Sequence, residues 1–133
     1  MTLHLLRMAV KIESISHLKE VQAERFRQER KKGGKYFYTF TRNIPRRKEE
    51  LLDGGSIYWV IKKYIRARQP IVGFEKRTND EGRNYCAIRL EPEPIQVISH
   101  RQKAFQGWRY LTSEDAPSDL NLNDIQVDGI PTE

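Results

Sequence analysis

Apolar and polar residues alternate along this 133-residue chain with two different periods, and the period predicts which segments are strands and which are helices. Residues 3–10 alternate in the manner of a strand. Over residues 15–32 the apolar side chains fall on one arc at about 100° per residue, which predicts a helix with one buried face. Ser14 or Ser16 is the expected N-cap, because a serine hydroxyl accepts a hydrogen bond from a free amide of the first turn. Gly33-Gly34 ends the helix.

The rest of the folded part is predicted to be a series of short strands and one short helix. Pro45 suits the first position of a helix, so we expect a helix over residues 46–52 that ends at Gly54-Gly55. A turn over residues 79–82 separates two strands, and Pro70 predicts a bulge or an edge position because proline has no amide hydrogen to donate. The predicted strands cover residues 36–41, 56–62, 65–74, 84–90 and 95–98.

Five or six strands in successive hairpins, with two helices, predict the α+β fold class. Short strands around one core favour a small, mostly antiparallel β-barrel or half-barrel with the two helices at its flanks. We expect one domain over residues 1–111. Residues 112–133 are rich in Asp, Asn, Ser and Pro, which predicts an acidic, loosely attached C-terminal tail.

The charge of the chain is divided unevenly between these two parts. All 24 lysines and arginines lie at or before Arg109, whereas residues 112–133 hold six acidic residues and no basic one. The overall net charge of +6 therefore hides a net charge of +12 in residues 1–111. A body of this charge attracts polyanions because binding releases their counterions, although charge alone also serves solubility.

The composition favours a cytoplasmic protein without catalytic or metal chemistry. The single cysteine, Cys86, forms no internal disulfide, which suits a reducing compartment, and no apolar run is long enough to span a membrane. The three histidines are scattered, so we expect no metal site, no cofactor and no catalytic residue. Cys86 alternates with Ile88 and Leu90 and is expected to be a buried small hydrophobic residue.

Basic residues cluster beside aromatic ones at several places, and this combination is typical of nucleic-acid binding. Arginine holds phosphate through two hydrogen bonds, and aromatic rings stack on unpaired bases. Trp59 alternates with Ile57 and Ile61 and is expected in the core, whereas Trp108 suits a pocket wall as well as it suits the core. The candidate nucleic-acid-binding residues are Arg42, Arg46, Arg47, Lys62, Arg66, Arg68, Gln106, Trp108 and Arg109.

Several long strings resemble an uncharacterised bacterial family, known mainly from alphaproteobacteria and classed as a domain of unknown function. The strings are Thr41-Arg42, Pro45-Arg46-Arg47, ELLDGGSIYWVIK (residues 50–62) and FQGWRYL (residues 105–111). The resemblance runs from Leu3 to about Leu120. Lys63 departs from it, standing where a glycine is expected, and no proline precedes Phe105. The order of elements is also similar to that of PUA-like domains, including the ASCH and EVE branches, which bind RNA or modified bases.

Three functions of different classes follow from these observations. The first is a PUA-like domain that binds RNA, single-stranded nucleic acid or a modified base without catalysis. Arg42, Arg46 and Arg47 would then hold phosphate, and Arg66 and Arg68 would line the approach. Gln106, Trp108 and Arg109 would contact a base. The second is a protein-interaction module whose acidic tail covers the basic body. The third is a hydrolase or transferase acting on a nucleotide. A concave basic pocket containing Trp108 would favour the first or third, and a flat apolar patch the second.

Overall fold

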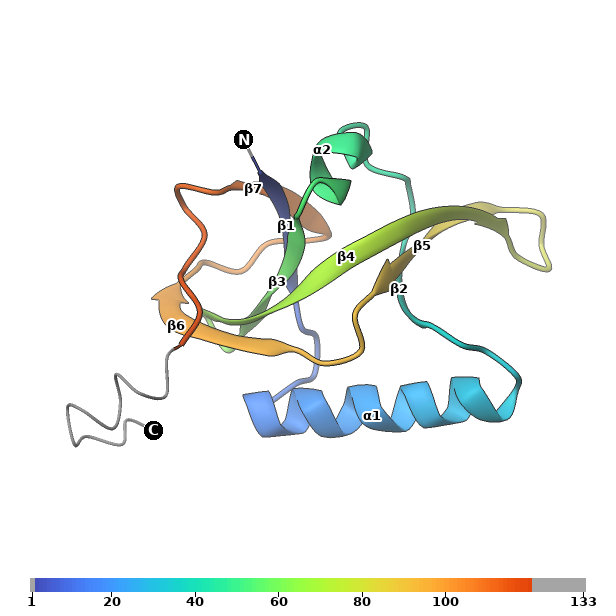
Figure 1. The fold of residues 1–133 in the computed structure, drawn as a ribbon, viewed down its shortest axis with the longest axis horizontal. Helices are drawn as coiled ribbons and strands as arrows, with labels where there is room; N and C mark the ends of the chain where they lie inside the picture. Colours follow the sequence, from blue (N-terminus) through green and yellow to red (C-terminus); the bar gives the residue numbers. More distant parts are fainter. Residues whose placement is uncertain (1, 121–133) are drawn as a thin grey trace.

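The computed structural model describes residues 2–120, in which two helices and seven strands form a mixed α+β fold (Figure 1). The α+β class predicted from the sequence is therefore confirmed. The strands of residues 2–120 are β1 (Leu3–Met8), β2 (Phe37–Thr41), β3 (Ser56–Ile61), β4 (Tyr64–Thr78), β5 (Asn84–Leu90), β6 (Ile95–Arg101) and β7 (Trp108–Thr112). The helices are α1 (Ile15–Lys31) and α2 (Lys48–Leu52).

The strands form one sheet in the order β2-β5-β4-β3-β1-β7, with β6 paired to β4 beside this path. Only β1 and β3 run parallel among the described strands, and the other pairs are antiparallel. The long strand β4 joins the two parts of the sheet: its first half pairs with β3 and β6, and its second half pairs with β5. In Figure 1, β4 crosses the molecule and α1 runs below the sheet.

The closed barrel, one of the two forms expected, is wrong because the sheet is open. Among the described residues β2 and β7 pair on one side only, so the sheet ends at these two strands instead of closing on itself. Side chains span the open side in place of a backbone ladder: Arg7 Nη1 of β1 donates a hydrogen bond to Thr39 Oγ1 of β2 at 3.0 Å. Nearby, the amide of Arg47 donates to the Tyr110 hydroxyl of β7 at 3.2 Å.

The local pattern predicted most elements, with corrections at their ends. Ser14 caps α1 as expected, since its hydroxyl accepts a hydrogen bond from the amide of His17 at 3.1 Å. The second helix begins at Lys48 rather than at residue 46, and β6 continues to Arg101. β7 was not among the regular strands predicted, although it contains most of the FQGWRYL string. The register of β4 shifts between Ile71 and Gly73, directly after Pro70, which agrees with the bulge predicted there.

The two glycines after α2 are required by the path of the chain. Gly54 has a φ of +85°, in the left-handed region that glycine adopts without strain. A Cβ on Gly55 would lie 2.3 Å from the carbonyl oxygen of Leu3 and 2.4 Å from that of Leu51. The Gly-Gly pair thus lets α2 end against β1 and lets β3 begin at once.

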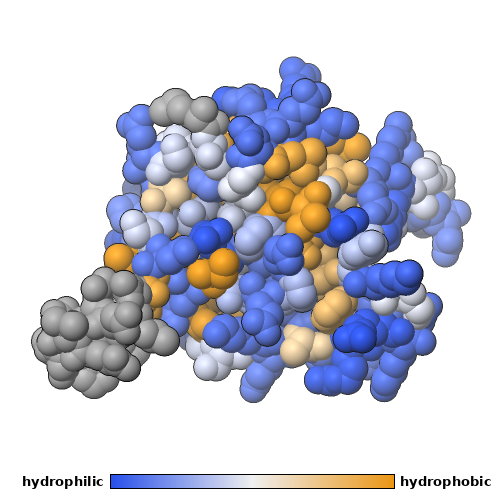
Figure 2. All heavy atoms as spheres, viewed as in Figure 1, coloured by the Kyte–Doolittle hydropathy of each residue, from blue (hydrophilic) through white to orange (hydrophobic). Residues whose placement is uncertain are grey.

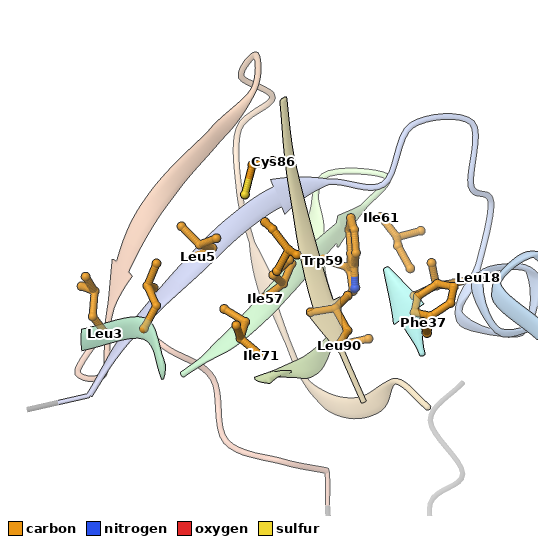
Figure 3. Packing of buried hydrophobic residues seen from close by; sticks show 13 residues of the cluster. Leu3, Leu5, Leu18, Phe37, Ile57, Trp59, Ile61, Ile71, Cys86 and Leu90 are labelled. Carbon is orange, nitrogen blue, oxygen red and sulfur yellow. The ribbon is translucent and has the colours of Figure 1, made fainter. Parts of the chain in front are cut away.

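The core lies on both faces of β3, all of whose residues are buried. The larger cluster contains Trp59 together with side chains from β1, β2, β4, β5 and both helices (Figure 3). Trp59 is only 6% exposed, which confirms it as a core residue. The smaller cluster lies between β3, β6 and β7 and includes Tyr58, Val97 and Leu111. Cys86 belongs to the larger cluster and is fully buried, as predicted.

The chain after β7 returns to the sheet along β6. The amide of Ile98 donates to the carbonyl oxygen of Ser118 at 2.8 Å, and the amide of Leu120 donates to that of Gln96 at 2.9 Å. The beginning of the predicted tail therefore contacts the folded domain at residues 118–120. The remainder of the predicted tail, residues 121–133, lies outside the described residues.

Hydrophilic residues cover most of the face seen in Figure 2, and one group of hydrophobic residues gathers over β4 below α2. Leu52 of α2 and Val72 of β4 are among the large hydrophobic residues that remain exposed. Neither helix within residues 2–120 is both long and apolar enough to cross a membrane.

Candidate functional site

A groove of about 770 Å³ lies between α1 and the open side of the sheet. We call it the groove throughout. One wall is α1, the opposite wall is β2, and the ends of β1 and β3 contribute Arg7 and Trp59. The loop of residues 105–107 completes the rim, where Gly107 has a φ of +73° that favours glycine. A space of this size fits a nucleotide-sized or drug-sized ligand.

Arg7 is the most distinctive polar residue of the groove. Its side chain is half-buried, and its guanidinium donates to Thr39. Among residues 2–120 no carboxylate forms an ion pair with it. Burial without a compensating charge lowers the pKa of Arg7 from its ordinary value, yet a guanidinium stays protonated in proteins. Arg7 thus presents a partly desolvated positive charge to the groove, and an anion would satisfy it.

The charges on the helical wall nearly balance each other. Arg25 and Lys32 line the groove there together with Glu24 and Glu29. Glu24 already pairs with Arg27 and accepts a hydrogen bond from Gln28. Arg7 adds a positive charge on the opposite side of the groove from this wall.

A buried network of amides lies beneath the groove. Gln69 of β4 is fully buried and exchanges two hydrogen bonds with Gln22 of α1, at 2.7 and 3.0 Å. The indole Nε1 of Trp59 donates to the same Gln69 Oε1 at 2.9 Å, and Gln69 Nε2 also donates to the carbonyl oxygen of Glu91. Because every buried side-chain polar atom of the described residues is satisfied, the network fixes α1 against the sheet.

Further aromatic lining comes from β2 and the segment before it. Tyr36, Tyr38 and Phe40 line the groove, and Tyr36 and Phe40 are 43% and 47% exposed. Phe105 reaches the groove from the loop before β7. Aromatic rings beside a positive charge are suited to hold a base and its phosphate.

The structure brings only one of the nine predicted site residues into the groove lining. Gln106 lies at the rim and is exposed. Trp108 lies next to it in sequence and opposite Arg7 in the β1–β7 ladder, but it packs edge-to-face on Tyr110 and against the core. Arg109, on the other side of β7, lies over the ring of Phe105 at 4.8 Å.

Most of the other predicted residues already have partners. Arg47 pairs with Glu50 and lies over the ring of Tyr110, and Lys62 pairs with Glu13. Arg66 lies over the ring of Tyr64. Arg68 pairs with Asp119 through two hydrogen bonds at 2.7 and 2.9 Å and also donates to Ser56. Arg42 and Arg46 are exposed. The Arg68 guanidinium lowers the pKa of Asp119 from its usual range.

Sequence reasoning missed Arg7, Gln22 and Gln69. One signal was present: Arg7 interrupts the apolar run of β1, and a charge at an inward position of a strand requires a partner or a ligand. The pairing of Gln22 with Gln69 joins residues 47 positions apart in the chain. No local pattern reports a contact of that kind.

The buried titratable groups of residues 2–120 have structural surroundings. Within residues 2–120 no three His, Cys, Asp or Glu side chains gather to hold a metal ion. His4 is buried in β1, where its Nδ1 accepts a hydrogen bond from the amide of Ser56 at 3.0 Å. Burial, and then the charge of Arg68, lower the pKa of His4. Burial raises the pKa of the Cys86 thiol, which keeps it protonated and unreactive.

The described residues thus form an α+β domain with an open sheet and a groove that contains Arg7. Residues 5–133 match the model of a family described as a protein of unknown function, DUF1489, and the chain belongs to that family. The resemblance to an unknown-function family is thus confirmed. No curated protein and no solved structure matches the chain.

Proposed function

We propose that the protein binds single-stranded nucleic acid, with one nucleotide held in the groove, and that it does so without catalysis. The observation that carries this proposal is Arg7, a half-buried guanidinium without a carboxylate partner among the described residues, in a groove lined by aromatic rings. A phosphate accepts hydrogen bonds from arginine with matched geometry. The ring of Phe105, which reaches the groove from the loop before β7, would then stack on the attached base.

The charge of the whole domain supports the same class of ligand. Residues 1–111 carry a net charge of +12, so polyanions are attracted to the molecule before any specific contact forms. In this proposal the preferred ligand is RNA, and the protein acts in the cytoplasm. The similarity in element order to PUA-like domains also favours RNA as the ligand. A nucleotide of RNA, with a modified base or an ordinary one, presents a planar base and a phosphate.

The predicted basic residues take a secondary role in this proposal. Arg42 and Arg46 are exposed and can approach phosphates outside the groove, whereas Arg68 must first release Asp119. Gln106 at the rim is placed to donate to or accept from a base edge. The specific contact is therefore assigned to Arg7 and Gln106, and the general attraction to the exposed arginines.

The test is the salt dependence of binding in an Arg7→Met variant. Methionine keeps the apolar part of the side chain and removes the charge, and Arg83→Met in the exposed turn before β5 is the matched control. With a fluorescently labelled single-stranded RNA, Arg7→Met should weaken binding by about 1.5–3 kcal/mol, the value of a hydrogen bond to a charged group. It should also reduce the slope of log K against log salt by about 0.7. Equal losses in Arg7→Met and Arg83→Met would show general charge attraction only and would contradict a site at Arg7.

A further inference from the structure

The outward face of the β2–β5–β4 part of the sheet carries a continuous set of aromatic rings and guanidinium groups. We call it the aromatic face; it consists of Tyr36, Tyr38, Phe40, Glu75, Arg77, Tyr85 and Arg89. The side chains on the opposite face of the same strands, such as Phe37, Ile88 and Leu90, belong to the core. The aromatic residues of the aromatic face therefore do not pack in the core.

Three rings of the aromatic face lie in a row that crosses from β2 to β5. Tyr38 and Phe40 stack at 6.4 Å between ring centroids with an interplanar angle of 24°. Phe40 meets Tyr85 of β5 at 5.8 Å. Phe40 is 47% exposed, and Tyr36, which lies directly before β2, is 43% exposed. Single exposed aromatics are common on protein surfaces, but a row of adjacent rings on one sheet face is the arrangement on which unpaired bases stack.

Guanidinium groups lie flat on this face and set its charge. Arg77 lies over the ring of Tyr38 at 4.5 Å, and Arg89 lies over that of Tyr36 at 3.6 Å. Glu75 accepts hydrogen bonds from Arg77 and from the Tyr38 hydroxyl and so neutralises one of the two arginines. Arg89 has no carboxylate partner among residues 2–120, so the face keeps a positive charge. This charge favours a polyanion over an apolar protein segment.

The aromatic face and the groove share one border. Tyr36, Tyr38 and Phe40 belong to the aromatic face and also line the groove, because β2 is the last strand of the sheet. An extended chain that leaves the groove over the edge of β2 therefore reaches the aromatic face at once.

We propose that the aromatic face is a second subsite for the same single-stranded nucleic acid, on which the bases following the one in the groove stack. This inference rests on the proposed function. It specifies the ligand further: a flexible single strand of several nucleotides reaches both surfaces, whereas a rigid duplex cannot bend over the edge of β2, and a mononucleotide occupies the groove alone.

The test uses Tyr85, which belongs to the aromatic face but does not line the groove. Tyr85→Leu removes the ring and keeps an apolar side chain, whereas Tyr85→Phe keeps the ring. Tyr64→Leu is the matched control, because Tyr64 is likewise a partly exposed strand tyrosine but lies in the first half of β4, where the sheet pairs with β6. Each variant is titrated with a 5′-phosphorylated dinucleotide and with a single-stranded oligouridylate of about twelve nucleotides, a length within the range of single-strand sites. Thermal melting checks that each variant is folded.

We expect Tyr85→Leu to weaken binding of the oligouridylate about five-fold or more, the effect of one lost stacking contact. Its binding of the dinucleotide should be unchanged, because the second base reaches only the edge strand β2 and not Tyr85 on β5. Tyr85→Phe and Tyr64→Leu should behave as the unmodified protein. Unchanged oligouridylate binding in Tyr85→Leu, with a loss in Arg7→Met, would overturn the second subsite and leave the proposed function standing; a peptide occupant of this face would give that result. Absence of binding to either probe in the unmodified protein would overturn both.

Discussion

Replacement of Gln69 by leucine should destabilise the protein strongly, although leucine is apolar and close in size to glutamine. Gln69 is fully buried and holds three partners: the side chain of Gln22, the indole of Trp59 and the carbonyl oxygen of Glu91. Leucine leaves the Trp59 and Gln22 groups buried without a hydrogen bond. Each orphaned buried group costs about 1–3 kcal/mol, so the free energy of unfolding should fall by about 2–6 kcal/mol.

The measurement is urea denaturation monitored by tryptophan fluorescence, which reports directly on the surroundings of Trp59. Gln96→Leu on the exposed part of β6 is the control and should change the free energy of unfolding by less than about 0.5 kcal/mol. In the double variant Gln22→Leu/Gln69→Leu the cost should be smaller than the sum of the single costs, because both members of the amide pair are gone. A loss below about 0.5 kcal/mol in Gln69→Leu would refute the reasoning, since it would mean that the network does not hold α1 to the sheet.

Three further predictions concern positions outside this network. Trp59→Ala should lower the free energy of unfolding by about 3–5 kcal/mol. Trp108→Ala should lower it by less, because Trp108 is only half-buried. Equal losses of the two variants in chemical denaturation would contradict this prediction. Lys63→Gly should raise the free energy of unfolding by about 0.5–1 kcal/mol, and the melting temperature with it. Lys63 has a φ of +74°, a conformation that costs a residue with a Cβ about 1–2 kcal/mol. An unchanged free energy of unfolding would argue against strain in this turn. The lowered pKa of His4 means that the folded protein favours the neutral imidazole, so this contribution to stability is complete above about pH 6.5 and is lost as the pH falls through the folded-state pKa. His4→Gln should flatten the stability profile as the pH falls below about 6.5.

The elements of this fold were largely predictable because each is specified by neighbouring residues. The cap at Ser14, the bulge after Pro70 and the stop at Gly54-Gly55 all arise from local chemistry. The glycine expected by resemblance at position 63 also has a local reason, since the turn between β3 and β4 places that residue in the left-handed region.

The open sheet could not be predicted in this way. Whether β2 pairs with β7 depends on residues about 70 positions apart, and hydrophobic alternation gives the faces of a strand but not its partners. The string FQGWRYL did not read as a regular strand, because only Trp108 and Tyr110 alternate with polar positions there. Its place beside β1 becomes evident only in the folded molecule.

The candidate site shows the same division between local and distant information. Basic clusters were visible in the sequence, but their neutralisation was not: Arg68 meets Asp119 and Lys62 meets Glu13 across long stretches of chain. In the sequence, Arg7 is a single arginine in a predicted strand, which does not by itself predict a binding site. It gains its significance from the absence of a carboxylate partner among the described residues and from the walls that α1 and β2 place around it.

The most direct test of a nucleotide site at Arg7 is an NMR titration of the protein with the 5′-phosphorylated dinucleotide. The side-chain Nε–H signal of Arg7 and the indole N–H signal of Trp59 both report on the groove. The account predicts saturable shifts of both signals, together with backbone shifts in β2 and at Gln106, and no shift at Arg83. Shifts confined to Arg42, Arg46 and other exposed arginines, with the Arg7 and Trp59 signals unchanged at saturation, would contradict it.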